Sequence, residues 1–193
     1  MALLEIFIVS TRPGRKGATV AKWFEAQARQ HAGFEIEVVD LAEINLPMMD
    51  EPEHPRLKQY QHEHTKRWSA IVERADAFVF VTPEYNYCTP PSLINALDYL
   101  VHEWAYKPVG FVSYGGVSGG LRSVQMTKLL VTSLKMMPMF ESVAIPFFTK
   151  AIDAHTGVFA PGEVQDKSSQ VMLNELLKWT GALKTLRPIA AKA

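Results

Sequence analysis

The chain has 193 residues, of which 48% are hydrophobic, and its 20 basic side chains balance its 20 acidic ones. This composition supports a core and one domain over residues 1–193, and it excludes a disordered chain or a strongly charged surface for nucleic acid or membrane lipid. One cysteine, Cys88, excludes an internal disulfide and a cysteine-rich metal site, and it favours a reducing compartment, by default the cytoplasm.

The first predicted strand covers residues 3–9, a short apolar run with no basic leader before it. A polar loop follows at 10–17, and Val20, Trp23 and Phe24 then recur at helical spacing. No apolar segment approaches the length that spans a membrane.

The loop at 10–17 has the composition of an anion site. Free N–H groups at a helix start favour a phosphate, Ser10 and Thr19 offer hydroxyls, and Arg12 or Arg15 offers a bidentate fork. Gly-x-Gly-x-x-Gly and Gly-Lys-Ser/Thr are absent, which disfavours a dinucleotide Rossmann site and a P-loop. The alternative is a solvated basic loop.

Apolar and polar side chains alternate over residues 34–39, which predicts a second strand. A proline- and acid-rich loop follows at 44–55, and a helix is predicted over 57–74. His62 and His64 in that helix would point to different sides, so we interpret them as solvated side chains. The other histidines have no metal-ligand spacing, and no metal is predicted.

The apolar run 77–81 predicts a buried third strand, and Thr-Pro-Glu-Tyr-Asn-Tyr-Cys-Thr-Pro-Pro follows it at 82–91. Prolines, an aromatic ring and an amide at the carboxyl end of such a strand indicate a stiff loop for a flat cofactor. The alternative is a simple connection to the next helix, with Thr89 as N-cap and Pro90 and Pro91 in the first turn.

A fourth strand is predicted at 107–114, and it enters a loop with four glycines at 115–120 that lets backbone approach a ligand. A short fifth strand is predicted at 142–145, a small hairpin near 154–157, and a last helix over 163–186. The methionine cluster at 136–139 either fills the core or, with Trp104 and Tyr106, forms a subunit contact.

Alternating strands and helices without a dinucleotide fingerprint predict an α/β fold: a flavodoxin-like, three-layer, doubly wound parallel sheet of five strands in the order 2-1-3-4-5. The loops after strands 1, 3 and 4 then meet at one edge of the sheet. The loop after strand 1 would bind a phosphate, the loop after strand 3 a flat ring, and the loop after strand 4 the edge of that ring.

Three motifs carry a family resemblance: residues 10–15, residues 83–86 together with 95–98, and residues 114–120. In this order and spacing they resemble the NADPH-dependent FMN reductase family over nearly the whole chain to about residue 145. The resemblance implies non-covalently bound FMN, with its phosphate on the first loop, its ring against the second and its pyrimidine edge near the third. The implied cofactor-binding residues are Ser10, Arg12, Arg15, Gly17, Thr19, Val20, Pro83, Glu84, Tyr85, Asn86, Tyr114, Gly115, Gly116 and Ser118.

The resemblance further implies an NAD(P)H oxidoreductase that passes hydride from NADPH or NADH to FMN and then to a quinone, azo compound, metal oxyanion or free flavin. The expected cycle is ping-pong, and no side chain is predicted as catalytic acid or base because the cofactor carries the chemistry. Family members commonly form dimers or tetramers. The alternatives are a flavodoxin-like electron carrier and a non-catalytic FMN-binding regulatory protein.

Four positions depart from the family pattern. Val9 replaces a usual glycine and is expected to narrow the space at the phosphate, and Ile94 replaces a lysine and removes a charge. Cys88 occupies a position where the family commonly has serine, and Pro91 one where it commonly has glycine.

Overall fold

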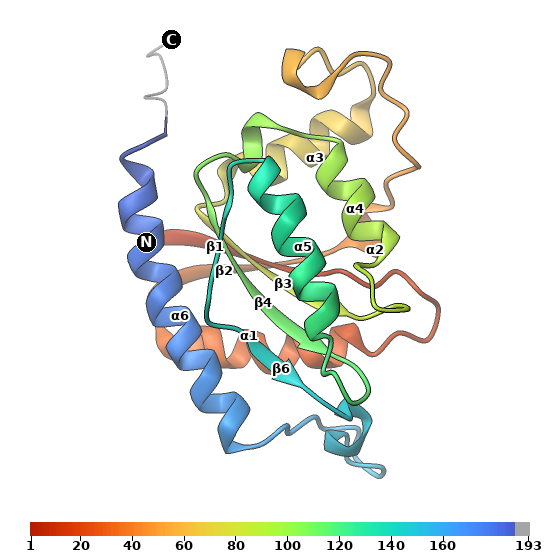
Figure 1. Cartoon of the computed structure of the whole chain (residues 1–193), viewed down its shortest axis with the longest axis vertical. Helices are drawn as coiled ribbons and strands as arrows, with labels where there is room; N and C mark the ends of the chain where they lie inside the picture. Colours follow the sequence, from red (N-terminus) through yellow and green to blue (C-terminus); the bar gives the residue numbers. More distant parts are fainter. Residues whose placement is uncertain (188–193) are drawn as a thin grey trace.

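The computed structural model describes residues 1–187; residues 188–193, which the predicted domain includes, lie outside the described part. A parallel sheet forms the middle layer, and its strand order β2-β1-β3-β4-β5 confirms the predicted doubly wound topology (Figure 1). The strands are β1 (Ala2–Ile8), β2 (Phe34–Asp40), β3 (Ala77–Pro83), β4 (Pro108–Tyr114) and β5 (Met137–Pro138), and β6 (Val143–Ile145) also pairs with β4.

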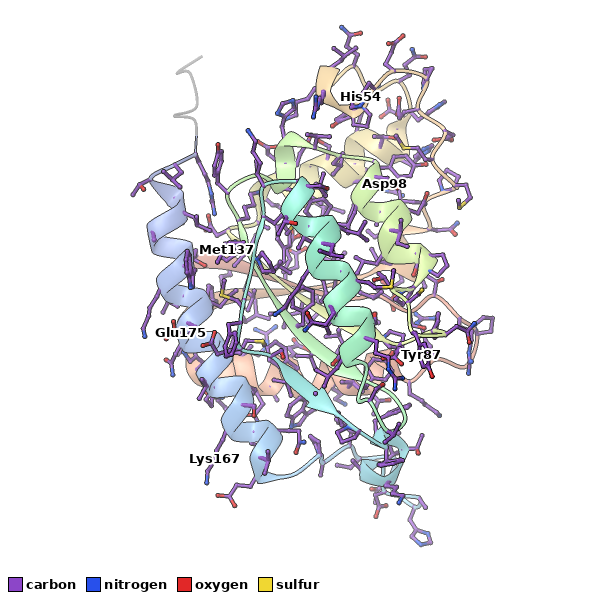
Figure 2. All side chains as sticks on the ribbon, viewed as in Figure 1. His54, Tyr87, Asp98, Met137, Lys167 and Glu175 are labelled. Atoms are coloured by element: carbon purple, nitrogen blue, oxygen red, sulfur yellow. The ribbon has the colours of Figure 1, made fainter. Side chains whose placement is uncertain are left out.

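The fifth strand predicted at 142–145 is β6, and a further strand of two residues, β5, precedes it along the chain. β5 pairs with the start of β4 and β6 with its end, and Met137 lies on the segment between α5 and β6 (Figure 2). β5 was missed because it has only two residues and Pro138 has no N–H to donate to a ladder. Met136 and Met139 are buried, so these two methionines fill the core.

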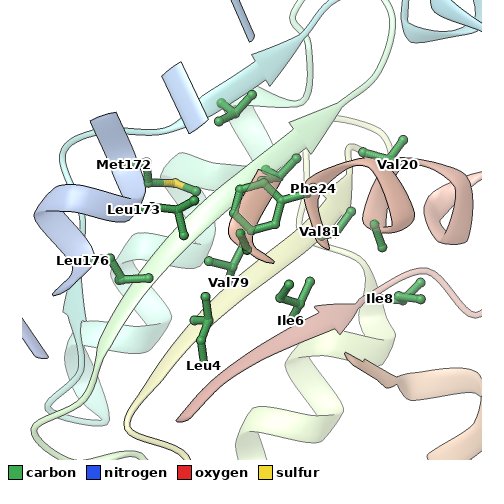
Figure 3. Packing of buried hydrophobic residues seen from close by; sticks show 14 of the residues in the cluster. Leu4, Ile6, Ile8, Val20, Phe24, Val79, Val81, Met172, Leu173 and Leu176 are labelled. Atoms are coloured by element: carbon green, nitrogen blue, oxygen red, sulfur yellow. The ribbon is translucent and has the colours of Figure 1, made fainter. Parts of the chain in front are cut away.

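Helices cover both faces of the sheet (Figure 1). Buried side chains of β1 and of the residue after it alternate between the two faces: Leu4, Ile6 and Ile8 face one layer, and Phe7 and Val9 face the other. The first layer is α1 (Gly17–His31) and α6 (Glu163–Lys184), and Figure 3 shows their buried side chains in one cluster with the even residues of β1. The second layer is α3 (Glu63–Arg74), α4 (Pro91–Asp98) and α5 (Leu121–Ser133).

The helix predicted to begin at residue 57 begins at Glu63. Pro55–Leu57 forms a separate 3₁₀ turn, η1, which ends where Lys58 adopts a left-handed conformation. The loop before α3 is fastened to α4, because Asn95 Nδ2 donates to the Pro47 carbonyl at 2.7 Å and the Met49 N–H donates to Asn95 Oδ1 at 2.9 Å.

The remaining short elements are α2 (Leu41–Ile44), η2 (His102–Trp104) and η3 (Phe148–Ala151). An antiparallel bridge between Ile152 and Phe159 closes the hairpin predicted near 154–157. The prediction that His62 and His64 point to different sides of a helix is wrong: His62 is the N-cap of α3, the two rings stack on each other, and both contact Asp50. Within residues 1–187, no group of three His, Cys, Asp or Glu side chains could hold a metal ion, and no helix could span a membrane.

A carboxyl side chain lies buried within the sheet. Glu5 of β1 is fully buried, and neither of its carboxyl oxygens accepts a hydrogen bond from residues 1–187. Arg74 Nε stands 3.6 Å away, while Glu37 is the neighbouring residue on β2. Burial raises the pKa of Glu5 to about 8, because the nearby cation only partly offsets the loss of water.

Glu5→Gln is expected to have a higher free energy of unfolding than the wild type at pH 8. The difference between the two proteins is expected to be smaller at pH 5. Between the ordinary pKa of 4.5 and the folded value of about 8, the folded wild type holds a proton that the unfolded chain releases. Wild-type stability therefore falls as the pH rises through this window. Urea unfolding at the two pH values measures the difference. Glu163→Gln, at an exposed side chain of α6, is the control, and a pH-independent difference for Glu5→Gln would contradict the assignment.

Candidate functional site

A cavity of about 410 Å³ opens at the carboxyl ends of β1, β3 and β4, where the three predicted loops meet. Open α/β sheets bind ligands at this edge. Nine of the fourteen predicted site residues line the cavity: Ser10, Arg12, Arg15, Pro83, Glu84, Tyr85, Tyr114, Gly115 and Gly116. Asn86 lines an adjoining hollow of about 630 Å³ that shares Arg12, Glu84 and Tyr85 with the cavity.

The loop after β1 brings cations to one end of the cavity. Arg15 is held in place by Asp40, whose Oδ2 lies 2.6 Å from the guanidinium, and the other Asp40 oxygen accepts the Ala42 N–H. Arg12 is exposed and forms no ion pair within residues 1–187. No side chain caps the start of α1, so its first N–H groups are available to an anion.

Gly17 shapes the wall of the cavity without lining it. A Cβ at this position would lie 2.8 Å from the Tyr114 hydroxyl, so a larger residue would displace a ring that lines the cavity. Burial raises the pKa of Tyr114, which keeps its hydroxyl neutral. Thr19 is half-buried on α1 and Val20 is fully buried in the core, so both lie outside the lining.

The loop after β3, residues 83–88, forms a tight turn that we call the ring loop. Tyr85 and Cys88 exchange two backbone hydrogen bonds of 3.1 and 2.9 Å, and Asn86 and Tyr87 adopt positive φ angles of 51° and 70°. The Tyr85 hydroxyl lies 2.6 Å from Ser10 Oγ and thereby joins the ring loop to the loop after β1.

Helix α4 follows the ring loop, and its N-cap is Pro90, so the predicted Thr89 cap is wrong. The Thr89 side chain instead forms a buried hydrogen bond of 2.8 Å with Thr127 of α5. Buried partners on α5 outcompete the exposed first turn of α4 for this hydroxyl. This contact packs the end of the ring loop against α5.

The glycine loop after β4 is tied to the segment that follows β6. The Gly115 carbonyl accepts the Phe148 N–H at 3.3 Å, and the Gly116 carbonyl accepts the Phe147 N–H at 3.0 Å. A Cβ at Gly116 would meet no atom within 4 Å, which leaves this part of the loop open to a ligand. Ser118 does not line the cavity itself, but its hydroxyl donates to the lining residue Glu84 at 2.9 Å.

Sequence reasoning missed five lining residues, which are Gly14, Lys16, Phe147, Phe148 and Thr149. Gly14 and Lys16 lie inside a loop that was already singled out. The aromatic pair lies between the predicted fifth strand and the predicted hairpin, where no site residue is predicted. Its position directly after the carboxyl end of a strand was the signal that could have identified it.

The departures from the family pattern lie in different places. Val9 is fully buried in the core on the α3 side, so it takes no space from the cavity. Cys88 and Pro91 line the adjoining hollow, and Ile94 is half-buried on α4.

Residues 3–150 match the family model of NADPH-dependent FMN reductases. The chain belongs to this family. Its curated relatives include an NAD(P)H-dependent FMN reductase of Schizosaccharomyces pombe, 38% identical over 73% of this chain and 72% of that protein. Another, from Nectria sp, is 36% identical over 76% of each chain. Membership confirms the resemblance, the oxidoreductase class, and FMN and NAD(P)H as cofactor and reductant of the family.

Solved structures agree on the fold. The flavoenzyme NAD(P)H:(acceptor) oxidoreductase FerB from Paracoccus denitrificans superposes with a TM-score of 0.74 at 21% identity, covering 94% of this chain and 98% of that chain. The doubly wound architecture is therefore confirmed independently of the sequence motifs.

Proposed function

We propose that this FMN reductase family member is a single-domain NAD(P)H oxidoreductase that holds FMN non-covalently in the 410 Å³ cavity. One observation carries the proposal: the cavity lining combines cationic side chains from the loop after β1 with aromatic side chains and glycine backbone from the segments after β3, β4 and β6. A molecule with a phosphate at one end and a flat ring at the other matches this distribution.

The phosphate end would be formed by Arg12, Arg15 and Lys16 with the N–H groups at the start of α1. Arg15 is oriented by Asp40, so its guanidinium is already fixed before a ligand arrives. Ser10 is 1% exposed and offers its hydroxyl to the same end. These donors suit a phosphate dianion.

The ring end would be formed by Tyr85, Tyr114 and Phe148 around the open backbone of Gly116. Tyr114 and Phe148 contact each other edge to face, with ring centroids 4.9 Å apart. Aromatic side chains and bare backbone favour a planar ligand and keep water from its face.

Bound FMN supplies a ring that takes hydride from NAD(P)H and passes electrons to an acceptor. The residues around the cavity would position that ring. Glu84, the carboxyl group in the lining, does not act as a proton donor. Burial acts to raise the pKa of Glu84, but hydrogen bonds from Ser118 and Arg122 outweigh it and hold the pKa below its usual range. Glu84 therefore stays ionised at neutral pH and has no proton to donate to the ring.

The adjoining hollow of about 630 Å³ would receive the nicotinamide and the acceptor in turn, which is a ping-pong cycle. We propose a quinone, azo compound, metal oxyanion or free flavin as acceptor. Two relatives support the first two classes: an FMN-dependent NADPH-azoreductase of Staphylococcus saprophyticus, 28% identical over 67% of this chain, and an NAD(P)H:quinone oxidoreductase of Solanum tuberosum, 35% identical over 47%.

An absorbance titration tests the proposal. The purified protein is expected to show bound-flavin bands after FMN is added and the excess removed, and these bands are expected to bleach when NADPH is added without oxygen. Bands that persist would favour an electron carrier or a regulatory protein. A protein that retains no flavin would contradict the cofactor assignment.

We also propose a homodimer or homotetramer in the cytoplasm. Leu121, Met126 and Leu129 of α5 expose 43%, 41% and 75% of their surface, which supports burial against a second copy. A single free cysteine suits a reducing compartment. Light scattering coupled to size-exclusion chromatography measures the oligomeric state.

A further inference from the structure

The ring loop has a conformation that its own residues do not favour. Asn86 and Tyr87 are consecutive non-glycine residues with positive φ, and a bulky residue such as tyrosine rarely adopts this conformation. The turn therefore depends on contacts from outside. Ser10 holds one side through the Tyr85 hydroxyl.

Arg122 of α5 holds the other side of the ring loop. Its Nη1 donates to Glu84 Oε1 at 2.8 Å, and its backbone N–H donates to Glu84 Oε2 at 3.1 Å. Its guanidinium also lies 4.1 Å from the centroid of the Tyr87 ring. Tyr87 lies beside the beginning of α5 in Figure 2, so one side chain contacts the first and the last part of the turn.

The same contact sets the charge at the cavity wall. The Glu84 side chain is only 9% exposed, lines both the cavity and the adjoining hollow, and is ionised because its pKa is held low. An unpaired carboxylate in this place would oppose added negative charge on a neighbouring ligand. Arg122 places a compensating positive charge against it.

We propose that Arg122 is a positioning residue: it holds the ring loop through Tyr87 and neutralises Glu84, and it thereby sets the reduction potential of FMN bound in the cavity. This inference rests on the proposed function. Lysine would not replace Arg122 fully, because an ammonium group lacks the planar fork that pairs with a carboxylate and stacks on a ring at once.

The charge role is tested by the midpoint potential of bound FMN in three variants. Arg122→Gln leaves Glu84 uncompensated and is expected to lower the potential, while Glu84→Gln leaves Arg122 uncompensated and is expected to raise it. Each change is expected to alter the equilibrium constant for reduction about tenfold, which is about 30 mV for a two-electron couple. The double variant is expected to return close to the wild-type value.

Opposite signs distinguish this role from simple damage to the loop, which would move both single variants in the same direction. Arg29→Gln removes an exposed ion pair on α1 and serves as the control. Arg122→Lys keeps the charge and is expected to restore most of the potential. Single variants with wild-type potentials, or shifts of the same sign, would overturn the proposal.

The positioning role is tested without cofactor. The contribution of Tyr87 to the near-ultraviolet circular dichroism of the apoprotein is identified as the signal that Tyr87→Phe removes. Arg122→Gln and Arg122→Lys are both expected to lose this signal, because both lack the stacked guanidinium. An unchanged spectrum would contradict this part. Failure of the wild type to bind FMN would instead refute the proposed function, so the two failures are distinguishable.

Discussion

Arg12→Ala is expected to raise the dissociation constant for FMN by about tenfold to a hundredfold while leaving the apoprotein folded. Arg12 is exposed, lines the cavity and has no carboxylate partner within residues 1–187, so its loss disturbs no ion pair of the fold. A hydrogen bond to a charged group contributes about 1.5–3 kcal/mol, which corresponds to this range of affinity. Fluorescence quenching of FMN during titration with apoprotein measures the constant.

Arg29→Ala is the matched control for this experiment, because Arg29 lies on α1 in an exposed pair with Glu25, away from the cavity lining. It should bind FMN as the wild type does. Higher salt concentration should weaken FMN binding more in the wild type than in Arg12→Ala, because the variant has already lost one contact with the phosphate. If Arg12→Ala binds FMN with the affinity of the wild type, the assignment of Arg12 to the phosphate site is contradicted.

Phe7→Ala is expected to lower the free energy of unfolding by about 3–5 kcal/mol. Phe7 is fully buried at the centre of the α3-side core, with ring centroids of Trp68, Phe78 and Phe80 at 5.3, 5.4 and 5.4 Å. Aromatic rings from α3, β3 and η2 surround this side chain, so the structure has little freedom to close the space that alanine would leave.

Urea unfolding of the apoprotein measures the effect without the stabilisation that a bound ligand would add. Val164→Ala on α6 is the control: that side chain is 71% exposed, and its replacement should change stability by no more than about 0.5 kcal/mol. A loss below about 1 kcal/mol for Phe7→Ala would show that the aromatic cluster repacks.

The sheet order and the meeting point of the three loops were predictable from the sequence. Strand periodicity along the chain identifies the strands, and right-handed crossovers then restrict how parallel strands can be arranged. Once that order is fixed, Ser10, Pro83 and Tyr114 must come to the same edge, because each follows or ends a parallel strand. The family motifs added the identity of the ligand.

Contacts between distant segments could not be predicted in the same way. The pairing of Ser10 with Tyr85, of Arg15 with Asp40 and of Arg122 with Glu84 joins residues 75, 25 and 38 positions apart. No local pattern specifies such partners. Phe147 and Phe148 likewise entered the cavity lining only through backbone bonds to Gly115 and Gly116.

The sequence by itself determined the topology, the cavity's place at the sheet edge and its cationic end, because strand period, loop composition and chain order are local properties. Only the tertiary structure decided which cation is free, which is already paired, and how the ring loop is held. Arg12 and Arg15 are equivalent in the sequence, yet Asp40 holds one and leaves the other exposed. Side-chain pairing depends on distances between elements, which are set when the helices pack on the sheet.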